Sequence, residues 1–195
     1  MSGETDRAGA RPSAARERLL ETAAELFYRE GITRVGLDRV LTEAGVPRAT
    51  MYRHFAGKEA LVAACLERED SRIRLALGPV VTGAADPLDD VLELIADDLA
   101  TRHTRGCPFI NAAVEYPDVT SEVRRIVDAH RAWFRALLRD AVEAHRPELS
   151  AAEVTALAEG LFLLRDGALI GGYLDGPAVV CSAFLRSARA IVDAR

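Results

Sequence analysis

The chain has only three cysteines, Cys65, Cys107 and Cys181, and their spacings are wide and unrelated. An odd number of scattered cysteines argues against a disulfide framework and against a paired zinc-ligand motif. His103 precedes Cys107 by four residues, but no further ligands accompany the pair. We therefore expect no metal and no cofactor, and we interpret the cysteines as buried free thiols.

Long apolar runs and catalytic patterns are absent as well. No stretch approaches the roughly 18 consecutive apolar residues that a membrane span needs. The N-terminal residues 1–11 are polar rather than a basic segment leading into an apolar run. We expect a cytoplasmic protein without a membrane partner. Because no nucleophile–base pattern, phosphate loop or carboxylate pair stands in a recognisable context, an enzyme is a disfavoured alternative.

Charge is distributed unevenly along the 195 residues. The formal net charge is -5. Residues 1–58 nevertheless carry ten Lys and Arg against eight Asp and Glu, whereas the remainder carries fifteen against twenty-two. A mildly basic head thus precedes an acidic body, which is compatible with one end meeting phosphate groups.

Apolar residues recur at helical spacing along almost the whole chain, and we find no alternating strand pattern and no internal repeat. The sequence therefore predicts an all-α protein with nine or ten helices. Residues 1–12 lack an apolar period and are expected to form a mobile tail. Residues 13–58 form a first unit, a fourth helix over 58–77 connects, and residues 78–195 form the second unit. The last two helices are expected to be joined by residues 171–177.

The first unit has the pattern of a helix-turn-helix. One helix follows Ser13 and ends at Gly31, and a second contains Leu37 and Leu41. Gly45 suits the tight turn that follows, and Pro47 suits the first turn of a third helix. Such a pair of helices, joined by a short turn with glycine, places the later helix in the major groove of DNA.

The polar face of the third helix carries the candidate DNA contacts. Arg48 can donate two hydrogen bonds to a guanine edge, and Thr50 offers a hydroxyl and a methyl group. Tyr52, His54 and Lys58 can reach phosphate oxygens, and Lys58 also begins a helix whose free N–H groups attract phosphate. Met51 and Phe55 are expected to be core contacts.

Several motifs together resemble the tetracycline-repressor (TetR) family over about residues 14–66. They are Ala23-Ala24-Glu25-Leu26-Phe27, Gly31-Ile32, Ala44-Gly45-Val46, Thr50-Met51-Tyr52-Arg53-His54-Phe55 and Lys58-Glu59-Ala60-Leu61. The resemblance implies a homodimer that binds a palindromic double-stranded DNA operator. It also implies that the dimer leaves the operator when a small molecule enters the C-terminal domain.

By position, the resemblance assigns base contacts to Arg48, Ala49 and Thr50. It assigns backbone contacts to Thr33, Tyr52, Arg53, His54 and Lys58. Gly36 departs from the family, which usually has Ser or Thr there. Glycine can still cap the second helix, so only a side-chain contact with phosphate is in doubt.

The second unit carries less specific signals. A ligand cavity needs apolar walls and a few polar groups. Candidates for both, suited to an apolar or aromatic effector, are Phe109, Asn111, Glu115, Trp133, Leu137, Phe162 and Arg165. Core packing of the aromatic residues, and caps or ion pairs for the polar ones, are the alternative interpretation. The resemblance implies a dimer interface formed by Leu157, Leu161, Leu164, Ala168, Phe184, Ala188 and Ile191.

Two further alternatives remain open. Cys107 precedes Pro108 near the expected cavity, and a partly exposed thiol there would suit a redox-sensing regulator. A helical module that binds only protein is the other alternative, and it predicts no salt-dependent affinity for duplex DNA.

Overall fold

The computed structural model describes residues 13–83 and 86–194, and the expected tail over 1–12 lies outside these residues. This part of the chain forms nine helices and no strand, which confirms the all-α architecture. The helices are α1 (Ala14–Glu30), α2 (Leu37–Ala44), α3 (Arg48–His54), α4 (Lys58–Gly83), α5 (Pro87–Thr101), α6 (Pro108–Glu115), α7 (Glu122–His145), α8 (Ala151–Asp175) and α9 (Pro177–Asp193). None of them is long and apolar enough to cross a membrane.

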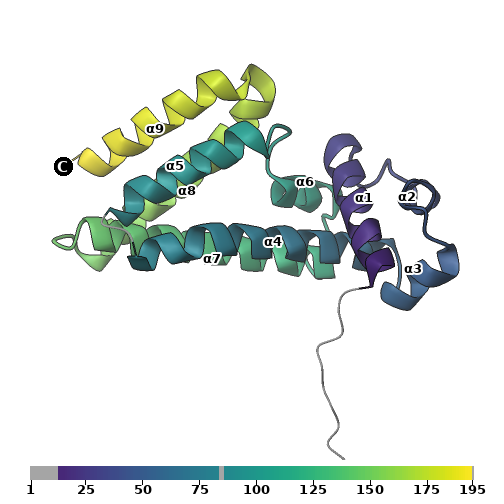
Figure 1. Cartoon of the computed structure of the whole chain (residues 1–195). Helices are drawn as coiled ribbons and strands as arrows, with labels where there is room; N and C mark the ends of the chain where they lie inside the picture. Colours follow the sequence, from purple (N-terminus) through teal and green to yellow (C-terminus); the bar gives the residue numbers. More distant parts are fainter. Residues whose placement is uncertain (1–12, 84–85, 195) are drawn as a thin grey trace, which may run out of the picture.

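The first three helices form a head at one end of an elongated body (Figure 1). α1 buries Leu19, Leu26 and Phe27 on one stripe and packs against α2 and α3. Gly31 ends α1 with a φ of 95°, which a residue with a Cβ rarely adopts. Because α2 and α3 are too short to be stable alone, burial against α1 holds them in place.

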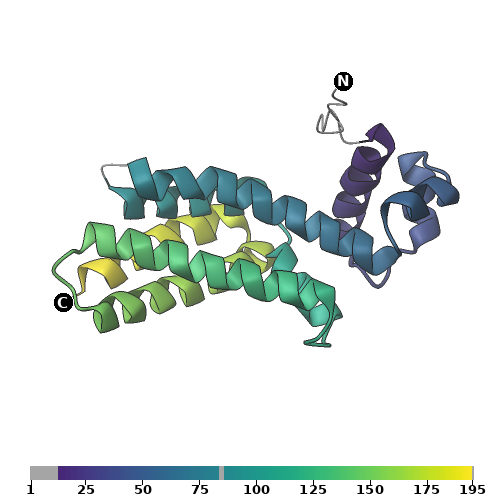
Figure 2. The same ribbon diagram turned by 90° about the horizontal axis from the view of Figure 1, so that it is seen from below.

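α4 leaves the head and runs through the body beside α7 (Figure 2). It extends to Gly83, past the predicted end at residue 77, and it includes Pro79. The sequence predicts that the helix ends before Pro79, because proline lacks the N–H that donates a hydrogen bond in a helix interior. Val80 and Val81 nevertheless pack against the core, and we attribute the continuation of the helix to this burial. The predicted helix end is therefore too early.

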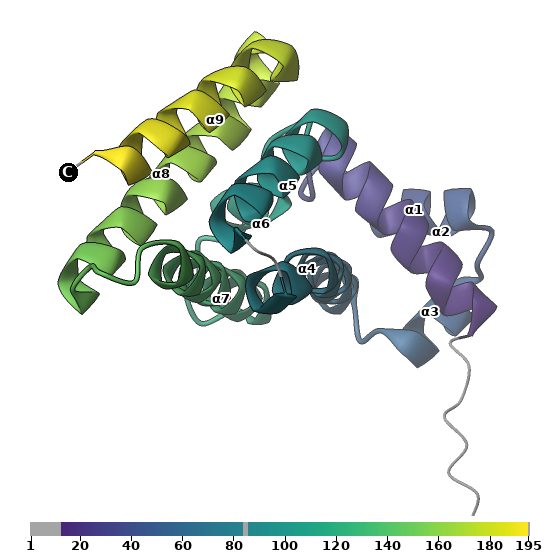
Figure 3. The same cartoon turned by 60° about the vertical axis from the view of Figure 1, so that its left-hand side comes forward.

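In the body, α8 and α9 lie side by side at the edge farthest from the head (Figure 3). The side chain of Ser121 accepts a hydrogen bond from the Arg124 N–H at 3.1 Å at the start of α7. Ser150 forms a capping box with Glu153 at the start of α8. These side chains satisfy N–H groups that the first helical turn leaves without partners.

The glycines near the end of α8 do not break the helix. α8 continues through Gly171 and Gly172 to Asp175, so the predicted connection over residues 171–177 shrinks to Gly176, which turns with a φ of 93°. Gly172 is buried against α5, where an added Cβ would lie 3.0 Å from Cδ2 of Leu99. The missing side chain therefore permits close approach of two helices rather than a turn.

Candidate functional site

The turn between α2 and α3 is formed by Gly45, Val46 and Pro47. Gly45 adopts the left-handed conformation with a φ of 61°. Val46 is buried, and its N–H donates to the carbonyl of Leu41 at 3.1 Å. Pro47 caps α3 instead of starting it, so the helix begins at Arg48, one position later than predicted. This geometry holds α2 and α3 as a helix-turn-helix pair.

α3 has a buried face and an outer polar face. Met51 is 0% exposed and Phe55, just beyond the helix, is buried too, so both expected core contacts are confirmed. The candidate DNA contacts on this helix are exposed or half-buried: Arg48, Ala49, Thr50, Tyr52, Arg53 and His54. The buried face therefore fixes the helix while the polar face stays accessible to a groove.

Some of these polar side chains already have partners within the head. The Arg48 guanidinium pairs with the Asp38 carboxylate of α2, and Nη2 of Arg53 donates to Oγ1 of Thr50 at 3.3 Å. Both Arg48 and Asp38 are mostly exposed. Because surface ion pairs contribute only about 0–1 kcal/mol, Arg48 can exchange Asp38 for a base edge at little cost.

Thr33 and Glu115 join the head to the body. The Glu115 carboxylate at the end of α6 accepts hydrogen bonds from the N–H of Ile32 at 2.9 Å and from the N–H and hydroxyl of Thr33 at 2.6 and 2.7 Å. Burial raises the pKa of Glu115, but these hydrogen bonds outweigh burial and hold the pKa below its usual value. In this conformation both donors of Thr33, a predicted phosphate contact, are engaged by Glu115. Glu115, predicted for the effector pocket, faces the head instead.

Lys58 starts α4 beside the head. Its ammonium lies 5.8 Å from the centroid of the Phe27 ring. Partial burial lowers the pKa of Lys58, although the nearby Glu115 carboxylate acts in the opposite direction. Because Lys58 is the first residue of α4, its ammonium stands at the positive end of a long helix. The charge of the ammonium and the helix dipole both attract an anion there.

Four of the predicted effector residues pack inside the body. Phe109 stacks on His130 with ring centroids 3.7 Å apart, and Phe162 is fully buried. Leu137 is buried, and Trp133 packs on the same core. None of the four lines the cavity beside α1 and α4 or the cavity between α4, α5 and α8. Their apolar surface is covered by the core itself, which is the usual place of aromatic residues at helical spacing.

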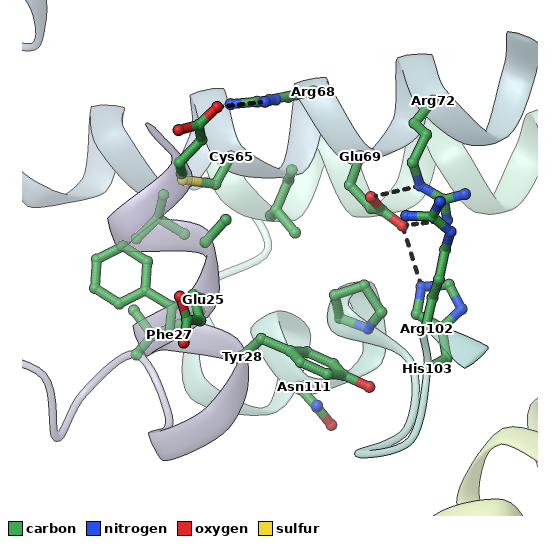
Figure 4. A pocket seen from close by; sticks show the side chains of 16 residues that line it. Glu25, Phe27, Tyr28, Cys65, Arg68, Glu69, Arg72, Arg102, His103 and Asn111 are labelled. Atoms are coloured by element: carbon green, nitrogen blue, oxygen red, sulfur yellow. Dashed lines mark hydrogen bonds and ion pairs between the residues drawn. The ribbon is translucent and has the colours of Figure 1, made fainter. Parts of the chain in front are cut away.

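Two cavities adjoin this core. The larger, about 620 Å³, lies between α1, α4 and the segment that leads from α5 into α6, and its walls include the predicted Asn111 (Figure 4). The smaller, about 220 Å³, lies between α4, α5 and α8 and includes the predicted Arg165. The larger cavity could not be predicted from the sequence, because its walls come from segments far apart in the chain. Tyr28, Arg102 and His103 at this cavity were therefore missed.

The residues predicted for a dimer interface lie largely inside the chain. Four are buried by the chain's own helices: Leu161, Ala168, Phe184 and Ala188. Three are partly buried: Leu157, Leu164 and Ile191. The large apolar side chains that α8 exposes are Leu163, Ile170, Tyr173 and Leu174. Because α8 is apolar on all sides, periodicity alone does not distinguish its inner from its outer face.

The three cysteines are free thiols. Burial raises the pKa of Cys65 to about 12, which makes its thiol unreactive. Cys107 precedes α6 and is 1% exposed, so in this conformation it lacks the exposure that the redox alternative expects. Among the described residues, no group of three His, Cys, Asp or Glu side chains could hold a metal ion.

Comparison with known proteins extends the match beyond the head. Residues 19–65 match the family model described as bacterial regulatory proteins, tetR family. The chain is 30% identical over 136 residues to the HTH-type transcriptional repressor NemR of Escherichia coli K12, which covers 67% of this chain and 68% of NemR. A solved structure of the reduced form of E. coli NemR is similar with a TM-score of 0.78 and 26% identity, covering 91% of this chain and 96% of that one.

A second solved structure is similar over nearly the whole chain. It is that of SCO4454, a TetR-family transcriptional regulator from Streptomyces coelicolor, with a TM-score of 0.86 and 37% identity. The similarity covers 92% of this chain and 94% of SCO4454. Together with the helix-turn-helix geometry of α2 and α3, these matches establish that the chain belongs to the TetR family of bacterial regulatory proteins and is a DNA-binding transcriptional regulator, not an enzyme.

Proposed function

We propose that the protein is a transcriptional repressor that binds a palindromic operator as a homodimer and is released by a small-molecule effector. It would act in the cytoplasm, on bacterial DNA. The observation that carries this proposal is α3, a helix anchored by the buried Met51 that presents an outer face of polar side chains. NemR is named a transcriptional repressor, which supports repression rather than activation of transcription.

Within the reader, we assign different tasks to different side chains. Arg48, Ala49 and Thr50 stand in the first turn of α3 and read base edges. Phosphate contacts come from Tyr52, Arg53, His54 and Lys58, and from Thr33 once Glu115 releases it. Phosphate contacts fix the position of the helix on DNA, whereas base contacts supply the sequence preference.

We assign the dimer contact to the outer face of α8. Leu163 is 65% exposed and Leu174 is 70% exposed, and Ile170 lies between them at helical spacing on the same face. Leu157, Leu164 and Ile191, which the sequence also predicted for this interface, are partly buried. An apolar row of this kind on a soluble helix favours association with a second copy, because burial removes its surface from water.

The direct test is selection of bound duplexes from a pool of random DNA sequences, followed by titration of the selected duplex at several salt concentrations. We expect an inverted repeat whose half-sites are about 10 base pairs apart, and an affinity that falls steeply with salt. Recovery of a sequence without symmetry would contradict the dimeric reader. An absence of salt-dependent binding would favour the protein-binding module instead.

A redox-sensing regulator that uses Cys107 is the second candidate. The similarity to the reduced form of NemR favours it, whereas the burial of Cys107 requires that the segment before α6 opens before an oxidant can react. Treatment with hydrogen peroxide should then weaken operator binding by the wild type and leave the Cys107→Ser variant unaffected. Equal losses in both proteins would remove this candidate.

A further inference from the structure

The larger cavity lies at the junction of the head and the body. Its lining includes Ala24, Phe27 and Tyr28 of α1, Val62 and Leu66 of α4, and Pro108 at the start of α6. Its volume of about 620 Å³ falls in the range of small-molecule sites. One wall thus belongs to the DNA-reading head and the others to the helices that carry the head.

The interior of the body offers much less room. Phe109, His130 and Phe162 are fully buried in contact with neighbouring rings. The cavity of about 220 Å³ between α4, α5 and α8 is smaller than a typical small-molecule site. Of these two cavities, only the one at the junction has the volume of an ordinary small-molecule site.

Charged side chains gather at one end of the junction cavity (Figure 4). His103 lies 2.8 Å from a carboxylate oxygen of Asp98 and 3.1 Å from one of Glu69, and Arg72 pairs with both carboxylates at 2.8 and 2.6 Å. Among the described residues, Arg102 pairs only with Asp98, at 4.0 Å, and Asp98 is already shared by His103 and Arg72. The Arg102 guanidinium is therefore the weakly paired cation at this end.

At the opposite end, the charged side chains that the structure describes are paired at shorter distances. Glu25 on α1 pairs with Arg29 at 3.0 Å, and Glu21 pairs with Arg68 at 3.5 Å. Much of the remaining lining is apolar, with Phe27 and Leu66 among its residues. A molecule that matches this surface has an apolar or aromatic body and a single anionic group directed at Arg102.

We propose that the junction cavity binds such an aromatic anion and that this ligand is the effector; the second part rests on the proposed repressor function. Hydrogen bonds at Tyr28 and at Glu115 are among those that join the head to the body. Tyr28 donates to the Gly106 carbonyl at 2.9 Å and accepts from the Arg105 N–H at 2.7 Å, and Glu115 holds the turn after α1. A ligand that prefers a wider spacing between α1 and α4 reorients the head, because it selects the conformation that gives it room.

The binding test uses two matched probes on the full-length protein. 8-Anilinonaphthalene-1-sulfonate is an aromatic anion, and N-phenyl-1-naphthylamine has the same ring system without the sulfonate. Fluorescence titration should show saturable binding of the anion. Arg102→Gln should weaken binding of the anion about tenfold and leave the neutral probe unchanged. Equal effects on both probes, or none on the anion, would overturn the anion assignment.

The location is tested with two cavity-filling variants, one at each cavity. Ala24→Leu adds three carbons to the wall of the junction cavity, and Ala76→Leu makes the same change at the smaller body cavity. Ala24→Leu should weaken the binding of both probes at least tenfold, an effect of the size expected for lost burial, while Ala76→Leu binds as the wild type does. Loss of binding only in Ala76→Leu, or in neither variant, would overturn the junction site. Circular dichroism and operator affinity without probe verify that both variants fold.

Operator titration with and without the anionic probe separates this proposal from the repressor function. Saturating probe should weaken operator binding by the wild type and leave that by Ala24→Leu unchanged. If the wild type binds its operator but the probe has no effect on it, the effector assignment fails and the repressor function stands. If no duplex is bound at all, the repressor function fails, while the probe titrations still decide whether the cavity is a site.

Discussion

At the scale of single residues, α3 and the start of α4 separate two kinds of DNA contact. Arg48 has a flat guanidinium near the beginning of the reader helix, held only by the exposed Asp38. Lys58 is a point charge at the start of α4, outside the reader helix. The first suits a base edge and the second a phosphate, because base recognition needs directed pairs of donors whereas phosphate recognition needs charge.

We therefore expect Arg48→Ala and Lys58→Ala to weaken operator binding in different ways. Arg48→Ala should weaken the free energy of binding to the selected operator by about 1–3 kcal/mol and change binding to unrelated duplexes little. Lys58→Ala should weaken both kinds of duplex similarly and reduce the salt dependence. Fluorescence anisotropy with specific and random duplexes at several salt concentrations measures both. Equal and negligible effects of the two changes would refute this division of tasks.

His130 is a residue whose protonation opposes folding. Its ring is 1% exposed, its Nδ1 lies 2.7 Å from Oδ1 of Asp70, and its Nε2 has no partner among the described residues. Burial lowers the pKa of His130 to about 4, and the Arg165 charge acts in the same direction, although the hydrogen bond to Asp70 opposes both. The imidazole is therefore neutral in the folded protein at pH 7.

This lowered pKa predicts a loss of stability in mild acid. Below the ordinary histidine pKa of about 6.5, His130 binds a proton in the unfolded chain but not in the folded protein. Stability linked to His130 is thus complete above pH 6.5 and declines between pH 6.5 and about 4. Between pH 7.5 and 5 the wild type should lose about 2 kcal/mol more than His130→Gln. Urea unfolding at fixed protein concentration measures this, and parallel pH profiles would argue against it.

At the scale of helices, α8 depends on glycine for its approach to α5. The Cβ of an alanine at position 172 would lie 3.0 Å from Cδ2 of Leu99, whose side chain is fully buried. At position 160 of the same helix the nearest atom, on Ile191, would be 3.9 Å away, an ordinary contact. The two glycines therefore have opposite consequences in one helix.

Alanine at these two positions should change stability in opposite directions. Gly160→Ala should raise the free energy of unfolding by about 0.5–1 kcal/mol, because alanine loses less backbone entropy in a helix. Gly172→Ala should lower it by about 1 kcal/mol, since the overpacking against Leu99 exceeds that gain. Urea unfolding of both variants tests the comparison, and a similar gain in both would mean that α5 can move away from α8.

At the scale of the whole molecule, the apolar row on α8 and the reader helix are linked through symmetry. A palindromic operator presents two equal half-sites, and a two-fold dimer presents two reader helices about 34–36 Å apart. A single copy would bind one half-site and lose most of the affinity. In the proposed assembly, the outer face of α8 would be required for operator binding although it is separate from the reader helix.

A charge placed on this row should separate the subunits. We expect Leu163→Glu to sediment as a monomer and to bind the operator much more weakly than the wild type, because two buried carboxylates would face each other across the symmetric contact. Leu75→Glu makes the same change at an exposed leucine on α4 and should remain dimeric. Sedimentation velocity distinguishes the two states. A dimeric Leu163→Glu would place the interface elsewhere.

The sequence by itself determined the local structure. The stripe of apolar residues in α1, the left-handed Gly45, the capping box at Ser150 and the polar face of α3 all depend on neighbours within a few residues. Propensity, capping and periodicity act over that same range, so these features and the helix-turn-helix could be predicted. The end of α4 and the connection after α8 were mispredicted because proline and glycine there are accommodated by packing.

Only the tertiary structure decided which surfaces meet. Phe109 fills the core while Asn111, two positions later, lines the junction cavity, and Glu115 bonds to the turn after α1. α8 buries Leu161 and exposes Leu163, although both are leucines on a helix that is apolar all round. Which side of a helix is buried depends on residues many positions away, which the burial of the whole core brings close. Local periodicity does not indicate these contacts.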